Sequence, residues 1–275
     1  MKIGAHVSIV GGYGASLESI VQKGGNCMQI FASSPRFWSQ PKVSESTITE
    51  FKNQKSALNI ENTYFHACYL INLANPERIG ESSVGSLTGE LTLASKMGIE
   101  GSIIHLGSLT NGTYETLITN IQRVLGSIPS DTVFIIENAG TRKIGTQLEE
   151  IGNIVRDVGS DQVKVCLDTC HLHAAGYDLS TKKSFEQFFL EFDKKIGLEK
   201  LEVIHMNDSK DSLGSNRDRH ENIGEGQISP EVFTQLLNHP ITKDLPFILE
   251  VPGFDKKGPD KKNIDIIKNL IISSE

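Results

Sequence analysis

The chain has none of the sequence features that mark exported or membrane proteins. The residues after Met1 include no apolar stretch long enough for a signal peptide or a membrane-spanning helix. Its four cysteines form no C-x-x-C pair, and a chain of 275 residues can bury a core that needs no disulfides. We therefore expect reduced thiols and a cytosolic protein, or a nuclear one in a eukaryote.

The chain also lacks an excess of positive charge, because 27 Lys and Arg residues face 34 Asp and Glu residues, a net charge of −7. Taken alone, this balance disfavours a nucleic-acid partner. Four of the negative charges belong to acids that the motifs below place together, and three divalent cations would change the net charge from −7 to −1. The local field, rather than the total charge, therefore decides whether phosphate binds.

No internal repeat, low-complexity tract or linker interrupts the chain, so we expect one domain over residues 1–275. Short apolar runs alternate with stretches of helical periodicity. The expected strands are Lys2–His6, Cys27–Phe31, Thr63–His66, Ser102–His105, Thr132–Glu137, Val163–Asp168, Leu201–His205 and Pro246–Glu250. The expected helices are Gly14–Gln22, Glu45–Leu58, Val84–Met97, Tyr114–Leu125, Gln147–Val158, Lys183–Ile196, Pro230–Leu237 and Asn263–Ile271.

This order of strand–helix units predicts the α/β class and, within it, a (β/α)8 TIM barrel. The alternative is a doubly wound open sheet, which would gather its ligands at one switch point. The candidate ligands here follow nearly all the strands, and this spread favours a closed barrel. The longest irregular stretch, 207–229, is typical of a functional loop.

Histidine and acidic residues follow the apolar runs with a regularity that indicates one site. A charged side chain after such a run is unfavourable in a core but common at the rim of a parallel barrel, where active sites form. His66 or His105 alone would more often be a satisfied core histidine, whereas Glu137 and Glu250 are rarely buried without a partner. The six runs are Phe65-His66, Ile103-Ile104-His105, Phe134-Ile135-Ile136-Glu137, Val165-Cys166-Leu167-Asp168, Val203-Ile204-His205 and Phe247-Ile248-Leu249-Glu250.

Two further motifs add candidate ligands. His171 lies three residues after Asp168, in the turn that follows a strand, although Asp168 could equally cap a helix and leave His171 in solvent. Asp218 and His220 point the same way in an extended loop, which is ligand spacing. Taken alone, such a charged loop is more often only solvated.

Together these motifs supply nine nitrogen and oxygen ligands, too many for one ion and suited to two or three. Imidazole mixed with carboxylate favours Zn2+, with Mn2+ or Fe2+ as alternatives. A thiolate from Cys68 or Cys170 is less favoured because harder ligands are close by. His6 also ends a strand, and we expect it to support a ligand rather than bind metal. The nine ligands are His66, His105, Glu137, Asp168, His171, His205, Asp218, His220 and Glu250.

These residues resemble the endonuclease IV family, the zinc-dependent apurinic/apyrimidinic endonucleases of base-excision repair. The resemblance covers nearly the whole chain. Its motifs are Gly4-Ala5-His6-Val7-Ser8, His66 with Tyr69-Leu70-Ile71-Asn72-Leu73, Glu137-Asn138, Asp168-Thr169-Cys170-His171, Ala174-Ala175-Gly176-Tyr177-Asp178, His205-Met206-Asn207-Asp208-Ser209-Lys210, Asp218-Arg219-His220, Gly224-Glu225-Gly226 and Glu250.

The resemblance implies a (β/α)8 barrel with three zinc ions at the strand ends and with Glu137 as the central catalytic carboxylate. It implies hydrolysis of the phosphodiester 5′ to an abasic site in double-stranded DNA, leaving a 3′-hydroxyl and a 5′-deoxyribose phosphate. We expect a monomer located in the cytoplasm with the nucleoid. The implied ligands are His66, His105 and Glu137 for the first ion, Glu137, Asp168, His205 and Glu250 for the second, and His171, Asp218 and His220 for the third.

The resemblance also places Arg36 and Tyr69 at positions that enter the DNA helix. An abasic nucleotide is easier to extrude than an intact one, and side chains must then fill the gap. Without the resemblance, Arg36 would be interpreted as a solvated side chain. Lys210 and Arg217 are expected to contact phosphates. Two departures from the family pattern, Leu106 where a proline is usual and a shorter loop at 139–143, change loops and remove no ligand.

Two other functions fit parts of the pattern. A metal-dependent sugar isomerase or epimerase on the same barrel would also use Glu, Asp and His at strand ends, but it would need only one or two ions. A catalytically silent binder of DNA lesions would need no complete ligand set. Activity on free sugars would support the first alternative, and retention of abasic DNA without cleavage would support the second.

Overall fold

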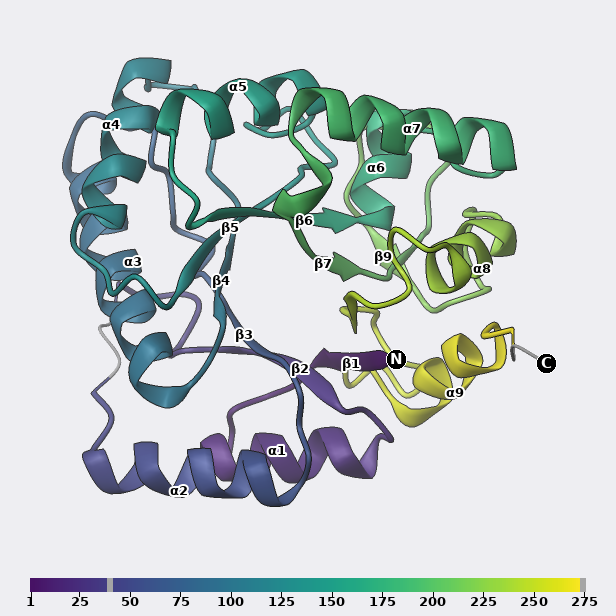
Figure 1. The fold of residues 1–275 in the computed structure, drawn as a ribbon, viewed down its shortest axis with the longest axis horizontal. Helices are drawn as coiled ribbons and strands as arrows, with labels where there is room; N and C mark the ends of the chain where they lie inside the picture. Colours follow the sequence, from purple (N-terminus) through teal and green to yellow (C-terminus); the bar gives the residue numbers. More distant parts are fainter. Residues whose placement is uncertain (39–41, 273–275) are drawn as a thin grey trace.

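The computed structural model describes residues 1–38 and 42–272. Eight strands form a closed barrel in the order β1-β10-β7-β6-β5-β4-β3-β2 (Figure 1). Every neighbouring pair is parallel, and β1 pairs with β10, so the first and last barrel strands close the ring. The TIM-barrel prediction is confirmed. The barrel strands are β1 (Lys2–His6), β2 (Cys27–Phe31), β3 (Thr63–His66), β4 (Gly101–Ile104), β5 (Val133–Glu137), β6 (Val163–Asp168), β7 (Leu201–His205) and β10 (Pro246–Leu249).

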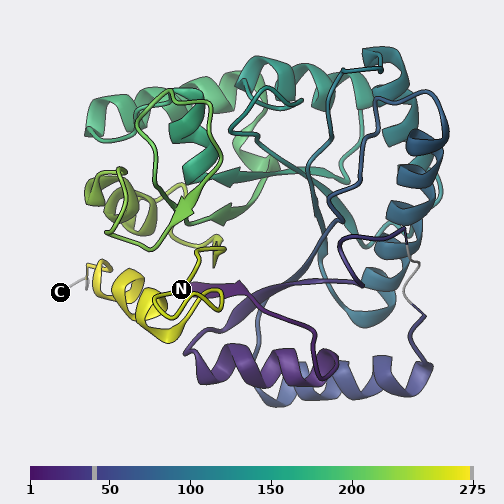
Figure 2. The ribbon, with the colours of Figure 1, turned by 180° about the vertical axis from the view of Figure 1, so that it is seen from behind.

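The helices surround the strands on the outside of the barrel, as the opposite view in Figure 2 also shows. Local capping explains several of their starts: Ser44 and Thr113 each accept a hydrogen bond from the backbone N–H three residues later. The predicted start of a helix at Pro230 is confirmed, and Pro occupies its first helical position. The helices are α1 (Tyr13–Gln22), α2 (Glu45–Ala57), α3 (Arg78–Met97), α4 (Tyr114–Leu125), α5 (Leu148–Val158), α6 (Thr169–Ala175), α7 (Lys182–Lys195), α8 (Pro230–Asn238), α9 (Lys261–Asn269) and the 3-10 turn η1 (Leu198–Lys200).

Three local predictions were wrong. Helix α3 begins at Arg78 rather than Val84, because its first turns bury Gly80 and Ser83 and therefore carry no apolar stripe. The segment after Asp168 is the helix α6 rather than a turn. The stretch 207–229 is not wholly irregular, since it contains the antiparallel strands β8 (Asp208–Ser209) and β9 (His220–Glu221).

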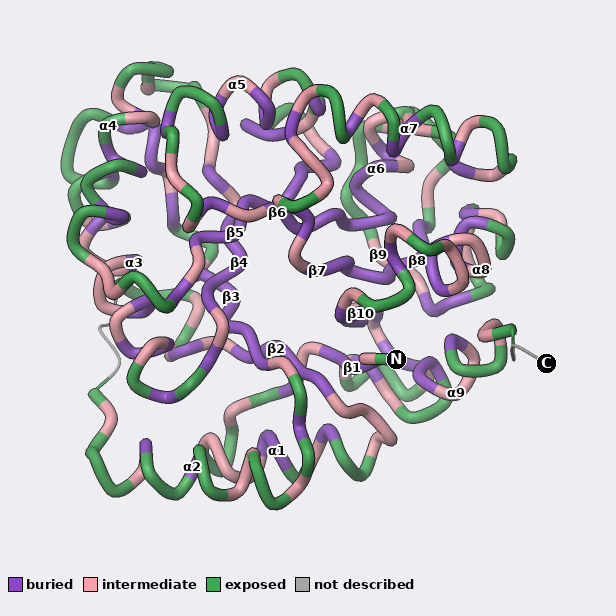
Figure 3. Tube along the Cα trace, viewed as in Figure 1, coloured by how far each residue is buried: buried purple, intermediate pink, exposed green. Residues whose placement is uncertain are grey.

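The core has two parts because side chains alternate along each strand. Phe134 and Ile136 of β5 join the large apolar cluster between strands and helices, whereas Ile135 joins a smaller cluster drawn from seven of the barrel strands. This smaller cluster fills the middle of the barrel with fully buried side chains, so no channel runs through it. Figure 3 shows the same pattern, with buried strands inside and exposed outer helix surfaces. Polar groups can therefore collect only at the two ends of the barrel interior.

The four cysteines are free thiols, as expected, and Cys27 and Cys166 lie in the interior cluster. Burial raises the pKa of the Cys166 thiol to about 12, which keeps it protonated at neutral pH. Among the described residues, no helix combines the length and apolar character needed to cross a membrane.

Candidate metal centre

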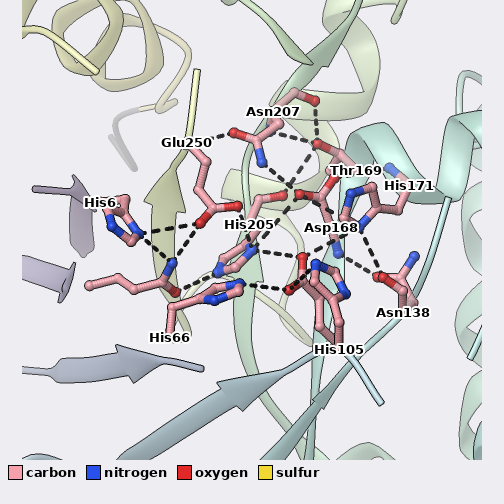
Figure 4. A network of polar contacts seen from close by, with 12 residues as sticks. His6, His66, His105, Asn138, Asp168, Thr169, His171, His205, Asn207 and Glu250 are labelled. Atoms are coloured by element: carbon pink, nitrogen blue, oxygen red, sulfur yellow. Dashed lines mark hydrogen bonds and ion pairs between the residues drawn. The ribbon is translucent and has the colours of Figure 1, made fainter. Parts of the chain in front are cut away.

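The carboxyl ends of the barrel strands bring six predicted ligands into one cluster (Figure 4). The strands are parallel, so their last residues meet at the same end of the barrel. Four ligands are the final residues of their strands and two follow their strands directly: His66 (β3), Glu137 (β5), Asp168 (β6) and His205 (β7), then His105 after β4 and Glu250 after β10.

Glu137 lies at the centre of this cluster and is fully buried. Its Oε2 is 3.3 Å from His66 Nε2 and 3.2 Å from His105 Nε2. Its Oε1 is 3.1 Å from His205 Nδ1 and 3.3 Å from His171 Nδ1. One oxygen of this carboxylate therefore faces His66 and His105 and the other faces His205, so Glu137 offers a separate oxygen to each of two donor groups.

A second group of donors surrounds His205. Its Nδ1 lies 3.3 Å from Glu250 Oε2 and 3.8 Å from Asp168 Oδ2. One ligand atom from each of Glu137, Asp168, His205 and Glu250 lies within 4.8 Å of the others, close enough for one ion to contact all four. Ligand atoms of His66, His105 and Glu137 also lie within 4.8 Å of one another and form a separate group.

The third group joins helix α6 to the loop that carries Asp218 and His220. Asp168 caps the helix by accepting from the His171 backbone N–H at 2.9 Å, yet His171 is only 2% exposed. Asp168 therefore caps the helix, as one interpretation of this motif predicted. The imidazole of His171 nevertheless points inward, as the ligand interpretation predicted. Asp218 Oδ1 lies 3.1 Å from His171 Nε2 and 3.4 Å from His220 Nε2. All nine predicted ligands therefore converge.

Cys170 is also close to the cluster, because its sulfur groups with ligand atoms of Asp168 and His220. Burial raises the pKa of this thiol to about 12. A thiol that holds its proton so firmly is a poor ligand compared with the imidazoles and carboxylates around it.

The charged groups of the cluster shift one another's pKa values. Burial alone would raise the pKa of Glu137, but His105, His205 and His171 hold it well below its usual range. Burial likewise opposes ionisation of Glu250, and His205 keeps its pKa well below the usual range. Burial lowers the pKa of His105 to about 4, so that ring is neutral at pH 7 and offers a lone pair. Burial also opposes the charge on His171 and His205, but nearby acidic groups raise their pKa values well above the usual range, so a bound cation would replace protons on these two rings.

Unpartnered nitrogens give a second reason why these residues fit a metal centre. Within the described residues, His105 Nδ1, His171 Nε2 and His220 Nε2 are buried ring nitrogens without a hydrogen bond. His171 Nε2 does lie near the Asp218 carboxylate, but not in hydrogen-bonding geometry. Buried polar atoms are rarely left unpaired. His171 Nδ1 donates to the Asn138 carbonyl at 2.9 Å, which leaves Nε2 as the nitrogen that faces Asp218 and could bind a cation.

Amides next to the ligands hold the carboxylates in place, and sequence reasoning did not assign them this role. Asn207 donates to Asp168 Oδ2 at 2.6 Å and accepts from the Glu250 backbone N–H at 2.7 Å. Asn138 accepts from the Asp168 backbone N–H at 2.6 Å. Both amides stand within two residues of a predicted ligand in sequence, and that proximity was the available signal.

Asp208 organises the loop that supplies the third group. Its two carboxylate oxygens accept from the backbone N–H groups of Ser209 at 2.7 Å and of Gly224, Gly226 and Ile228 at 3.0 Å. Gly226 must lack a side chain because a Cβ there would collide with this carboxylate. A single buried acid therefore ties both ends of the segment that presents Asp218 and His220.

The four residues expected to contact DNA lie outside the cluster. Tyr69 is 67% exposed at the mouth of the site, and its backbone N–H donates to Pro35 at 3.2 Å, which brings the exposed Arg36 loop beside it. Lys210 Nζ lies 3.8 Å from Glu221, and Arg217 lies 3.5 Å from Asp211. The structure thus pairs both of these cations with acids at the protein surface.

The cluster opens into a cavity of about 500 Å3. Metal-ligand candidates form its floor, and its walls include Phe31, Tyr69, Pro252 and Lys256. The two departures from the family pattern are both accommodated by local packing. Leu106 is fully buried and its carbonyl accepts from Leu73, while Gly140 in the shorter loop packs directly against His171.

Comparison with known proteins identifies the family. A family model described as "Xylose isomerase-like TIM barrel" matches residues 17–270. The "Probable endonuclease 4" of Halothermothrix orenii is 38% identical over 277 residues, covering 98% of this chain and 99% of that protein. The chain belongs to the endonuclease IV family. The crystal structure of endonuclease IV from Thermus thermophilus superposes with a TM-score of 0.88 at 32% identity, covering 98% of each chain.

The sugar-epimerase alternative has support only at the level of fold. A D-tagatose 3-epimerase-like protein shares the architecture with a TM-score of 0.73, but it is 21% identical over 98% of this chain and 97% of its own. That similarity shows a common barrel and does not extend to the reaction. Endonuclease IV relatives match more closely in both sequence and structure.

Proposed function

We propose that this chain is an apurinic/apyrimidinic endonuclease that hydrolyses the phosphodiester 5′ to an abasic site in duplex DNA. The two oxygens of Glu137 support this most directly, because one faces His66 and His105 and the other faces His205. The family membership supports DNA as the substrate, and a site with three donor groups suits phosphodiester hydrolysis better than the chemistry of a free sugar.

We assign three Zn2+ ions to the three donor groups, with Mn2+ or Fe2+ as possible replacements. Bound divalent cations supply Lewis acidity, which makes water a usable nucleophile at neutral pH and offsets the charge of the phosphate. The assigned ligands are His66, His105 and Glu137, then Glu137, Asp168, His205 and Glu250, then His171, Asp218 and His220.

The protein's own side chains supply the remaining parts of the mechanism. Glu137 stays ionised and holds its neighbours at fixed distances, and Asn207 fixes Asp168 and Glu250. Tyr69 and Arg36 stand at the mouth of the site, where they would fill the gap left by an extruded abasic nucleotide. Lys210 and Arg217 would exchange their acidic partners for phosphates. We propose a monomer of one domain that works where chromosomal DNA is found.

The test uses metal-stripped protein on a duplex that carries one tetrahydrofuran abasic analogue. Zinc-reloaded protein should nick this duplex 5′ to the analogue, and stripped protein should not. An undamaged duplex and free ketohexoses serve as substrate controls. Epimerisation of the sugars without nicking would favour the epimerase alternative, and tight retention of uncleaved abasic duplex by zinc-loaded protein would favour a silent binder.

A further inference from the structure

Gln29 is a buried polar residue in the middle of an apolar strand. It lies in β2 between Met28 and Ile30, and all three residues are fully buried. A buried amide must find hydrogen-bond partners for both its oxygen and its nitrogen. Those partners belong to the candidate metal centre or stand beside it.

The amide contacts three side chains from three other strand ends. Gln29 Nε2 lies 2.6 Å from Glu250 Oε1 and 2.9 Å from His6 Nδ1. Gln29 Oε1 lies 2.8 Å from His205 Nε2. Figure 4 shows His6, Glu250 and His205 around this point, on the side of the cluster where β1 meets β10.

The chemistry of an amide fixes the direction of each bond. Its oxygen can only accept, so His205 Nε2 carries a proton and donates it. The other nitrogen, Nδ1, is then the one that faces the cluster, 3.1 Å from Glu137 Oε1 and 3.3 Å from Glu250 Oε2. The reversed amide would direct its oxygen at the Glu250 carboxylate, placing two acceptors against each other.

The nitrogen side of the amide is equally selective. It can only donate, so His6 Nδ1 accepts and His6 is the neutral tautomer with its proton on the other nitrogen. Glu250 Oε1 is occupied by the same amide, which leaves Glu250 Oε2 as the oxygen that faces His205 and the cluster. One residue thereby determines which atom each of two ligands offers.

We propose that Gln29 is a positioning residue that makes His205 bind through Nδ1 and Glu250 through Oε2, by engaging the opposite atom of each. This inference rests on the proposed metal-dependent function. Partners of this kind commonly change metal affinity or activity by about 10- to 100-fold when they are removed. Gln29 is fully buried beneath the ligands, so its effect should appear in metal binding first.

Two variants separate the hydrogen bonds from packing. Gln29→Met keeps the length of the side chain but has no polar atom. Gln29→Glu keeps the shape but presents an acceptor to Glu250 where the amide donates. The matched control is Gln162→Met at the opposite end of the barrel, where the half-buried Gln162 donates to the Pro129 and Thr132 carbonyls at 2.9 Å.

The first measurement is zinc content by elemental analysis, followed by zinc affinity from competition with a chelator. We expect the wild type and Gln162→Met to retain the same number of ions. Both Gln29 variants should lose one ion per chain, with about 10- to 100-fold weaker affinity at that site, and Gln29→Glu should be the more affected. Excess zinc should restore nicking by Gln29→Met, which would not happen if the variant were merely misfolded.

The second measurement is made on the wild type, and the only variant it needs is one that identifies the His205 resonances. In zinc-loaded wild type, 15N-labelled imidazole spectra should show the His205 proton on Nε2, protected from exchange, with Nδ1 bound to metal. Finding the proton on Nδ1, or finding unchanged zinc affinity in both Gln29 variants, would overturn the role of Gln29 while leaving the nuclease proposal in place. A wild type that binds no zinc would overturn both.

Discussion

At the amino end of the barrel, Tyr64 donates to Glu202 at 3.0 Å and the Thr63 backbone N–H donates to Glu100 at 2.7 Å. Lys55 completes that network by donating to Thr63 and to the Gly98 carbonyl. At the carboxyl end, the buried side-chain polar atoms that lack a partner are found, within the described residues, on His105, Asn138, His171 and His220. Both ends bury polar groups, but only the amino end satisfies them from within the chain.

The difference separates a structural network from a binding site by a physical criterion. Burial of a polar group is unfavourable unless it is paired, so a folded protein keeps unpaired groups only where something else supplies the partner. Counting carboxylates would not have distinguished the two ends, since each end contains at least two of them. The unpaired ring nitrogens do distinguish them, and changes at the two ends should therefore have different consequences.

The sharpest test of this contrast is Glu137→Gln. The amide keeps the shape but offers one oxygen instead of two, so it cannot bridge two donor groups. Nicking of abasic duplex should fall by roughly a thousandfold or more while the circular dichroism spectrum is retained. Tyr64→Phe is the matched change at the amino end and should leave nicking unchanged. Equal nicking by wild type and Glu137→Gln would remove Glu137 from its central role.

Glu90 tests whether burial with little pairing is as unfavourable as the comparison implies. This acid of α3 is buried, its hydrogen-bond partner among the described residues is the hydroxyl of Ser102, and burial raises its pKa from 4.5 to about 7. The folded chain therefore binds this proton more tightly than the unfolded chain. Folding stability that depends on Glu90 is full below pH 4.5 and is lost as pH rises towards 7.

The Glu90→Gln variant has no proton to lose at this position, so it does not share the loss of stability of the wild type as pH rises. The stability of the variant relative to wild type should therefore improve from pH 5 to pH 8. The expected change in the free energy of unfolding is roughly 2 to 3 kcal/mol, from ~1.4 kcal/mol for each pKa unit. Urea unfolding of both proteins at the two pH values measures it. Glu81→Gln, an exposed change on the same helix, should show no such difference between pH 5 and pH 8. A pH-independent effect of Glu90→Gln would mean that Glu90 is already ionised when buried.

Asp208→Asn tests the loop that presents Asp218 and His220 separately from the rest of the carboxyl end. Asp208 now accepts hydrogen bonds from four backbone N–H groups, and the amide would turn its own N–H groups towards some of these donors. We expect the segment 207–229 to loosen and the ion nearest Asp218 and His220 to bind about 10- to 100-fold more weakly. Zinc content after dialysis and limited proteolysis of this segment measure the two effects. Glu225→Gln, an exposed change in the same loop, should alter neither.

Arg36→Ala should have the smallest effect, because Arg36 is exposed and belongs to neither network. In the Glu137→Gln background, which prevents cleavage, its loss should weaken binding to abasic duplex about tenfold, near 1.4 kcal/mol. Fluorescence anisotropy over a salt series measures this, with Arg156→Ala on the outer surface as the charge-matched control. Unchanged affinity at every salt concentration would show that the loop has only a structural role.

The sequence allowed the strand ends to be predicted well, because each His, Asp or Glu stood directly after an apolar run and parallel strands bring those positions together. The boundaries of β3, β6 and β7 agree with the predictions to the residue. The spacing of Asp218 and His220 also predicted correctly that both would face one cavity.

Other features depend on contacts that no local pattern contains. The start of α3 was missed because its buried residues are small, and α6 was missed because seven residues are too few for a periodic signal. Gln29 is visible in the sequence as a polar residue inside an apolar strand, but its hydrogen-bond partners come from positions 6, 205 and 250. Only the closed barrel brings these positions within hydrogen-bond distance.

The pairing of β1 with β10 has a consequence for how the protein is made. The last residues of the metal centre, Glu250 above all, leave the ribosome when most of the chain has already been synthesised, while His6 and Gln29 emerge near the start. A partly translated chain holds an incomplete set of ligands and lacks the closing strand. Closure of the ring and completion of the ligand set therefore coincide, and a nascent polypeptide has neither until its final strand arrives.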